Sequence, residues 1–350
     1  MAQQSPSIGV TFASFQALGL GYGIDIARSA ESLGFGSYWT AETIGHEAFA
    51  TLGAVAASTE TIEVGTGVIA LQLRTPMVAA MGAATIADLS PTPRMLLGIG
   101  ISSPVVVGRW HGMTYGDAPV AMTREYLELL HSCLSGDVVN HEGRFFQTKG
   151  FRLGVRLAEN RPKVILGALN SRMLKLAGEL ADGVLLNYLP ASAVPWCVEQ
   201  VRAGEAAVGR TPGSCRIYAY VHVGVCDADA ARSAARKDLF SYAVVPSYGR
   251  AFTRAGFGDE VKRIQAAHAN RDRQGAIDGV SDAMIDAIDI CGSAQHVRDS
   301  VAAYIDAGVE HAVVMPLPWG EDRRRTIEET LAAVAPLTRP TAAPSQETIT

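Results

Sequence analysis

Residues 94–104 read R-M-L-L-G-I-G-I-S-S-P and combine an apolar run with a turn rich in glycine and serine. The run from Met95 to Ile99 is typical of a parallel strand that is buried on both faces. The two glycines would let the backbone approach a ligand closely, and free N–H groups there suit an anion. Ser102 and Ser103 could donate hydroxyl groups to that ligand or cap the next helix. The stretch predicts either an anion-binding loop or an ordinary strand-to-helix turn.

Short apolar runs of this kind alternate with helical patterns along the chain, and no Gly/Pro-rich linker divides it. The predicted strands cover residues 8–13, 37–41, 62–70, 95–99, 163–168, 184–187, 216–225 and 311–315. The predicted helices cover residues 23–33, 47–58, 76–89, 122–135, 171–180, 192–208 and 321–334. Regular alternation of strand and helix predicts a parallel sheet, and about eight such units favour an α/β fold of the TIM (β/α)8 barrel type. A doubly wound open sheet is the alternative.

Two segments interrupt the alternation and are predicted to be insertions after strands, within one barrel domain of residues 1–338. Residues 137–150 have β character with a turn at Glu142-Gly143, which is typical of a hairpin. Residues 228–290 are helical with glycine breaks. Such excursions shape the substrate pocket of a barrel, although decoration or a subunit contact would also explain them. Residues 339–350 are predicted to be a disordered tail.

The composition argues against several kinds of partner. A net charge of −5 over 350 residues provides no basic surface for nucleic acid or an anionic membrane. No apolar run is long enough to span a bilayer, and the first residues do not resemble a signal peptide, so we expect a cytoplasmic protein. The five cysteines are scattered without a C-x-x-C motif, so no metal site is expected.

Polar side chains at the ends of the predicted strands are the candidates for chemistry, because barrel active sites lie there. Glu42 follows the second strand in W-T-A-E, and His46 comes shortly after it. A carboxylate and an imidazole at the barrel mouth could exchange protons with a substrate. The alternative is that Glu42 caps a loop and that His46 is solvated.

Glycines and short polar turns mark three further strand ends. The third strand contains V-G-T-G-V at 64–68, where paired glycines indicate a bulge or a contact with a ligand. The fifth strand ends in G-A-L-N at 167–170, directly before a helix whose first N–H groups could hold an anion. The sixth strand ends at Asn187. An ordinary loop with an Asn/Ser cap would also explain the fifth-strand turn.

Four stretches in this order resemble the luciferase-like (bacterial-luciferase-type) flavin and deazaflavin oxidoreductases. They are A-E-S-L-G-F-G-S-Y-W-T-A-E at 30–42, V-G-T-G-V at 64–68, the 94–104 stretch with W-H-G at 110–112, and L-A-G-E-L-A-D-G-V-L-L-N at 176–187. Within that superfamily the chain is similar to the coenzyme F420-dependent branch that includes methylenetetrahydromethanopterin reductase. The resemblance covers most of the chain.

The resemblance implies a TIM barrel that binds its coenzyme at the carboxyl ends of the strands. It implies a non-prolyl cis peptide bond behind the coenzyme ring, which here falls between Gly67 and Val68. It places the acid Glu42 near the reactive face, with His46 as a second candidate catalytic residue. The candidate coenzyme-binding residues are Gly65, Thr66, Gly67, Val68, Gly98, Gly100, Ile101, Ser102, Ser103, Gly167, Ala168, Leu169, Asn170 and Asn187.

The chain departs from the family pattern at three places. Many relatives have a histidine directly after the acid, where this chain has Thr43. The fifth-strand turn reads G-A-L-N where relatives often have a later glycine, so the helix start at Asn170 must bind without it. The serine loop reads I-S-S-P where relatives often have V-S-G-P, which adds a side chain to a usually bare backbone.

The resemblance therefore predicts hydride transfer between coenzyme F420 and a small organic substrate, with the protein binding the coenzyme and excluding water. Reduction of an imine or an activated C=C bond in cytosolic biosynthesis is the preferred reaction. An FMN-dependent monooxygenase on the same barrel is the alternative, and a coenzyme-binding paralogue without activity is a third reading. We also expect a cytoplasmic homodimer of actinobacterial type, and the composition given above predicts that it binds neither nucleic acid nor membrane.

Overall fold

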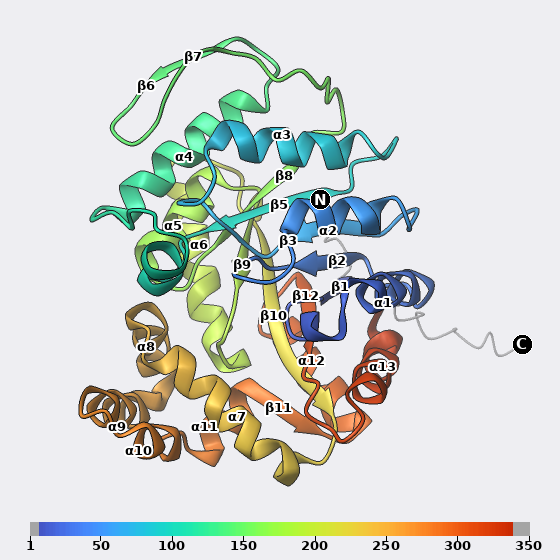
Figure 1. The fold of residues 1–350 in the computed structure, drawn as a ribbon, viewed down its shortest axis with the longest axis vertical. Coiled ribbons are helices and arrows are strands. Elements are labelled where there is room, and N and C mark those ends of the chain that lie inside the picture. The colour runs from blue at the N-terminus through green and yellow to red at the C-terminus, as the bar shows by residue number, and fades with distance from the viewer. Residues whose placement is uncertain (1–6, 339–350) are drawn as a thin grey trace, which may run out of the picture.

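The chain folds as a closed barrel of eight parallel strands surrounded by helices, as seen in a computed structural model that describes residues 7–338 (Figure 1). The barrel strands are β1 (Ser7–Thr11), β2 (Ser37–Thr40), β3 (Glu63–Thr66), β5 (Met95–Gly100), β8 (Lys163–Gly167), β9 (Gly183–Leu186), β10 (Arg216–Val225) and β12 (His311–Pro316). They pair in that order, and β12 closes the ring on β1, where Val10 lies opposite Val314. The predicted TIM barrel is confirmed, and closure excludes the open sheet.

The strands are apolar along their whole length because both of their faces are buried. In β5, every residue of M-L-L-G-I-G is buried. Alternate side chains fill the barrel interior, where Trp39, Leu96, Tyr218 and Tyr220 belong to one cluster. The other face packs against the helices, and Leu97 belongs to that larger cluster.

Eight helices cover the outside of the barrel in the described part of the chain. They are α1 (Leu20–Ser32), α2 (Ala48–Ala56), α3 (Pro76–Ala87), α4 (Pro119–Cys133), α5 (Ser171–Leu180), α6 (Val194–Ala207), α12 (Ala294–Asp306) and α13 (Arg323–Val334). Seven of them match predicted helices. Helix α12 was not predicted, although Ser293 caps it and Val297, Val301 and Tyr304 recur at helical spacing on its buried face.

Both insertions form the expected kinds of structure. The hairpin consists of β6 (Val139–Glu142) and β7 (Gln147–Phe151), and it follows helix α4 rather than a strand. The longer insertion contains α7 (Ala228–Ala243), α8 (Pro246–Phe252), α9 (Gly258–Ala269), α10 (Arg273–Asp278) and α11 (Asp282–Ile288), followed by an unpredicted short strand, β11 (Asp289–Gly292), that pairs with β10. Figure 1 shows the hairpin and these helices at opposite ends of the long axis of the molecule. Only the longer insertion follows a barrel strand.

The predicted third strand, 62–70, is in fact interrupted. Strand β3 ends at Thr66, and a short strand, β4 (Ile69–Ala70), then pairs with β5. The peptide bond between Gly67 and Val68 is cis, as the resemblance implied. The segment from Thr66 to Val68 is called the bulge below.

The bulge fits against β5 because two residues of that strand have no side chain. A Cβ atom on Gly98 would lie 1.8 Å from the Thr66 carbonyl oxygen, and one on Gly100 would lie 2.9 Å from a methyl carbon of Val68. Real Cβ atoms essentially never approach that closely, so the glycines are required for this contact. The glycine spacing of β5 therefore serves packing against the bulge.

Two expectations from the sequence concern the ends of the chain and membranes. The tail at 339–350 lies outside the described residues, so its predicted disorder stays a prediction. Among residues 7–338, no helix has the length and apolar character needed to cross a membrane.

Gly98→Ala is expected to destabilise the protein by about 3 kcal/mol, because overpacking against a backbone carbonyl forces the bulge to move. Urea denaturation of the variant measures the loss in free energy of unfolding. Gly21→Ala is the matched control, since a Cβ atom there meets no other atom within 4 Å on helix α1. An unfolding midpoint for Gly98→Ala as high as that of the control would contradict the prediction.

Candidate functional site

The bulge forms part of the floor at the carboxyl ends of the strands, and hydrogen bonds hold it on several sides. Its Gly67 N–H donates to the Thr40 carbonyl over 2.7 Å, and the buried Tyr220 hydroxyl donates to the Gly67 carbonyl over 2.9 Å. The Thr66 hydroxyl donates to the Gly98 carbonyl over 2.7 Å. Gly65 and Gly98 are buried and support the bulge, within which Thr66 is buried and Val68 is only partly covered.

The loop after β5 carries Ile101, Ser102 and Ser103, all partly exposed. The Ser103 hydroxyl accepts a hydrogen bond from the Val106 N–H over 3.2 Å and so caps the short π-helical segment Val105–Trp110. The Ser102 N–H points at the side-chain oxygen of Gln72, 3.4 Å away, while the Gln72 Nε2 atom is buried and has no partner among the described residues. The loop thus contains a cap, as one reading predicted, and also an unpaired buried donor that a polar ligand could satisfy.

The turn after β8 lies directly beside this loop. A Cβ atom on Gly100 would be 3.8 Å from the Gly167 Cα atom, so the two backbones are in contact range. Ala168 is buried and Leu169 is partly exposed. Asn170 occupies the N-cap position of α5 without capping it through its side chain, and its Nδ2 atom donates instead to the Ser247 carbonyl over 3.1 Å. The first N–H groups of α5 therefore lack a side-chain cap, as an anion site requires.

One arginine of the long insertion, Arg254, reaches this turn, and Arg250 lies near it; the sequence analysis missed both. The Arg254 guanidinium donates to the Leu169 carbonyl over 2.7 Å and lies 3.8 Å above the Trp196 ring. Burial and the neighbouring charge of Arg250 lower the pKa of Arg254, while the Cys197 thiol opposes this shift. A guanidinium beside uncapped N–H groups, with a second cation near enough to affect its pKa, is a favourable place for an anion.

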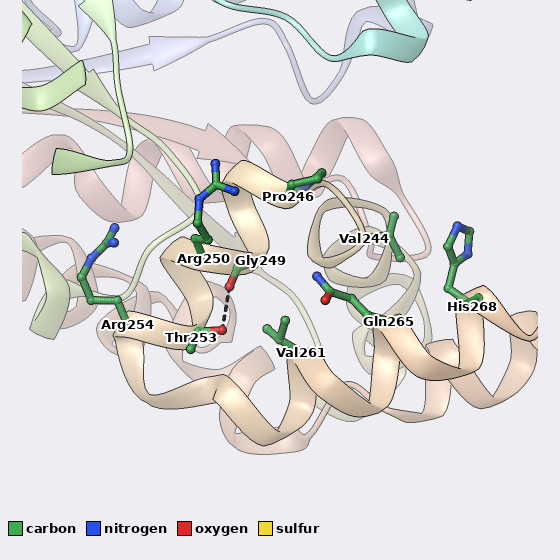
Figure 2. Close-up of a pocket in the computed structure, with 10 residues that line it drawn as sticks. Val244, Pro246, Gly249, Arg250, Thr253, Arg254, Val261, Gln265 and His268 are labelled. Atoms are coloured by element: carbon green, nitrogen blue, oxygen red, sulfur yellow. Dashed lines mark hydrogen bonds between the residues drawn. The ribbon is translucent and has the colours of Figure 1, made fainter. Parts of the chain in front are cut away.

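Figure 2 shows where these arginines originate. Arg250 and Arg254 line a cavity of about 750 Å³ between α8 and α9, and their side chains extend on the same side, away from α9. The cavity itself lies inside the insertion rather than at the strand ends. The four-residue spacing of the arginines within P-S-Y-G-R-A-F-T-R was visible in the sequence, but nothing there placed them beside β8.

Glu42 and His46 lie on the β2 side of the mouth. Glu42 accepts the Ala48 N–H over 2.9 Å at the start of α2 and forms an ion pair with Arg74. The His46 ring packs 5.4 Å from the Phe12 ring, and its buried Nδ1 atom has no partner among the described residues. No hydrogen bond joins Glu42 to His46 in the described part of the chain, so they are separate candidates for proton exchange.

A buried polar network on the opposite side was also missed by the sequence analysis. The His222 ring on β10 lies 3.0 Å from a carboxyl oxygen of Asp289 and 2.8 Å from the side-chain oxygen of Asn187. The Tyr188 hydroxyl donates to Asp238 of α7 over 2.8 Å. Asn187, predicted as a coenzyme residue, thus holds His222 in place. Only His222 lay on a strand predicted from the sequence, and nothing in the sequence placed Asp289 beside it.

Hydrogen bonds fix the protons of this network. The Asn187 oxygen also accepts the Tyr188 N–H over 2.9 Å, so it is an acceptor and the Nε2 atom of His222 carries the proton. Burial lowers the pKa of His222 to about 4, which leaves the ring neutral at pH 7. Its Nδ1 atom then has no proton to donate, so the proton between His222 and Asp289 belongs to the carboxyl group. Burial raises the pKa of Asp289, in agreement with this arrangement.

Asp238 is the acid of the network that reaches a cavity. Burial, reinforced by the nearby carboxyl of Asp289, raises the pKa of Asp238 to about 7. Together with Tyr188 and Tyr242, it lines a space of about 260 Å³. Ser14, after β1, and Met315, on β12, line the same space, which places it at the carboxyl ends of the barrel strands.

Comparison with known proteins gives one family and a consistent group of relatives. Residues 7–311 match a family model described as "Luciferase-like monooxygenase". The 5,10-methylenetetrahydromethanopterin reductase of Archaeoglobus fulgidus is 29% identical over 308 residues, which cover 86% of this chain and 91% of the relative. A putative coenzyme F420-dependent oxidoreductase of Mycobacterium tuberculosis is 28% identical, over 83% of this chain and 89% of the relative.

Among solved structures, the coenzyme F420-dependent tetrahydromethanopterin reductase of Methanopyrus kandleri superposes with a TM-score of 0.80. The match covers 96% of this chain and 100% of that one at 24% sequence identity. At 24% sequence identity, this structural similarity establishes only that the two proteins share the barrel fold.

Asp238→Asn is expected to stabilise the protein more near pH 8 than near pH 5, because only the parent must then bury a charged carboxylate. The raised pKa keeps a proton on the folded Asp238 up to about pH 7, whereas an unfolded aspartate loses it near pH 4. Parent stability therefore falls over this interval by at most about 1.4 kcal/mol per pH unit from this group.

Chemical denaturation at both pH values measures the effect. Asp259→Asn, on the exposed surface of α9, is the control and should show no such trend. A gain for Asp238→Asn that is equal at the two pH values would show that the carboxyl group is not buried as described.

Proposed function

Because the chain belongs to the luciferase-like monooxygenase family, we propose that it is a coenzyme F420-dependent oxidoreductase that transfers hydride between the deazaflavin and a small organic substrate. The observation that carries the proposal is the candidate anion site beside the bulge, where the N-terminus of α5 meets Arg254 and where the charge of Arg250 acts on Arg254. The names of the relatives support the choice of coenzyme, since two of them are called reductases of methylenetetrahydromethanopterin and one a putative F420-dependent oxidoreductase.

The residues at the barrel mouth fit such a coenzyme. A phosphate-bearing tail would lie against the first N–H groups of α5 and the two arginines, and Ser102 and Gln72 would supply further donors. The planar ring would lie over the bulge, where the partly exposed Val68 offers an apolar surface. We retain the residues of the two turns and the bulge, from the list given under Sequence analysis, as the proposed coenzyme site.

Bound there, the reduced deazaflavin would supply a hydride and its oxidised form would accept one. The chain itself binds and orients the ring, and its loops exclude water from the reaction. On the β2 side, Glu42 and His46 are the proposed proton-exchanging groups. Arg74 and the Ala48 N–H fix the orientation of the Glu42 carboxylate.

The finer features of the proposal follow the sequence analysis. We propose reduction of an imine or an activated C=C bond, carried out by a cytoplasmic homodimer. The hairpin β6–β7 is one candidate surface for the subunit contact, because it lies at the end of the molecule opposite the insertion helices (Figure 1).

Purified protein is expected to bind F420 in preference to FMN, and Arg254→Gln is expected to weaken F420 binding at least tenfold, or about 1.4 kcal/mol. The reason is that the variant removes one cation from the proposed phosphate site. Fluorescence titration with each coenzyme measures both effects. Arg263→Gln is the control, because Arg263 is exposed on α9 and pairs with Glu260.

Tight FMN binding without F420 binding would favour the monooxygenase instead. Binding of F420 that Arg254→Gln leaves unchanged would place the phosphate elsewhere. Binding of F420 without turnover on any imine or C=C substrate would favour the paralogue without activity.

Glu42→Gln is expected to slow hydride transfer by about a hundredfold, which is within the usual range for general acid–base help. Single-turnover kinetics with F420 measures the rate. Glu47→Gln is the matched control, because Glu47 also pairs with Arg74 and caps α2 but is exposed. Equal, small effects of the two variants would show that Glu42 only orients the loop.

A further inference from the structure

The smaller cavity, of about 260 Å³, brings together side chains of one chemical character. Aromatic rings come from Tyr188 after β9, Tyr242 on α7 and Trp319 after β12, and the single ionisable acid that lines it is Asp238. Met315 and Leu317 supply apolar surface. Among the described residues that line the cavity, none is basic.

The aromatic rings form a packed group around the acid. The Tyr188 and Tyr242 rings lie 3.7 Å apart between centroids, and Tyr248 packs edge-on against both, at 5.7 and 4.9 Å. Ring faces attract cations, and the attraction is stronger where water is excluded. An aromatic group with one carboxylate is therefore suited to an ammonium-type ligand.

The charge around the cavity is uncompensated. Asp238 lies beside Tyr188, which follows β9, and beside Tyr242 on its own helix. The His222 and Asp289 pair, on β10 and β11, also lies beside it. His222 is neutral and Asp289 keeps its proton, as argued above, so neither provides a positive charge to balance the Asp238 carboxylate. Of the three basic side chains of α7, Arg232 and Arg236 pair with the acids of α11, and Lys237 is exposed and does not line the cavity. A cation in the cavity would restore the balance, and an anion would be repelled.

We propose that this cavity binds a positively charged nitrogen group, which makes the substrate an iminium ion and the product its amine. The inference deepens the proposed function and rests on it for the reaction. A hydride from the reduced deazaflavin adds to the iminium carbon, the C=N π electrons become the nitrogen lone pair, and the coenzyme is oxidised. The neutral amine then takes a proton from solvent and remains paired with Asp238 as an ammonium ion.

The charge preference can be tested without coenzyme, so that failure of this inference is separate from failure of the proposed function. Isothermal titration calorimetry near pH 8 compares three probes of similar shape: cyclohexylamine, cyclohexanol and cyclohexanecarboxylate. We expect cyclohexylammonium to bind at least tenfold more tightly than cyclohexanol, a difference of about 1.4 kcal/mol. We expect no detectable binding of the carboxylate.

Variants connect the preference to named groups. Asp238→Asn should abolish the preference for cyclohexylammonium, and Asp259→Asn on the exposed surface of α9 should retain it. Tyr242→Phe, which keeps the ring, should bind within a few-fold of the parent, whereas Tyr242→Leu should lose at least threefold in affinity, since cation–π contacts contribute about 0.5–2 kcal/mol. In the parent, affinity for the ammonium probe should fall about tenfold from pH 8 to pH 6 as Asp238 gains its proton, and Asp238→Asn should show no such change.

Equal binding of the three probes, or tighter binding of the carboxylate, would overturn the proposal. One further outcome would replace it. The ligand atoms of His222, Asp238 and Asp289 lie within 4.8 Å of one another, which is compatible with a divalent metal. The three side chains form a metal site if Mn²⁺ or Zn²⁺ raises the melting temperature of the parent but not of Asp238→Asn, and if cyclohexylamine raises the melting temperature of neither protein.

Discussion

The contact between the bulge and the glycines of β5 and β8 determines how the barrel mouth is built. The Thr66 carbonyl group and the Val68 side chain occupy space that side chains on Gly98 and Gly100 would fill. Gly167 contributes in the same way, because a Cβ atom there would lie 3.2 Å from Val68. Since these glycines let three backbones meet, the bulge, the serine loop and the β8 turn are fixed relative to one another.

From this fixed floor, the long insertion divides the mouth into two sides of opposite charge. Its α8 helix carries Arg250, and the segment directly after α8 brings Arg254 to the turn after β8. Its α7 helix brings Asp238 and Tyr242 to the ends of β1, β9 and β12. An anionic coenzyme tail and a cationic substrate group would therefore bind at separate positions, and the bulge lies on the floor of the same mouth. The insertion thus acts as a wall of the site.

The acidic side chains of the mouth differ in how their charges are balanced. On the β2 side, Glu42 is paired with Arg74 and fixed by a backbone N–H, as is usual for a carboxylate that must stay in one place. In the α7 network, two acids share their surroundings with a neutral histidine and tyrosines. Burial penalises an isolated carboxylate more than one paired with a cation. Asp238 therefore favours its protonated form while the cavity holds no cation, and the proposed cationic ligand would replace that proton.

The sequence alone determined the barrel and the position of its strand ends. Eight apolar runs separated by helices at regular spacing specify a parallel ring, since each strand needs cover on both faces. Local motifs also located the loop at Ser102 and Ser103 and the turn at 167–170, and the family resemblance placed the cis bond of the bulge at Gly67-Val68. Only the tertiary structure placed Arg254 beside Leu169, and His222 beside Asp289. These partners are separated by 85 and 67 positions, and no periodicity encodes which insertion residue reaches which strand end. Packing of the insertion on the barrel decides those contacts, and with them the charge of each side of the site.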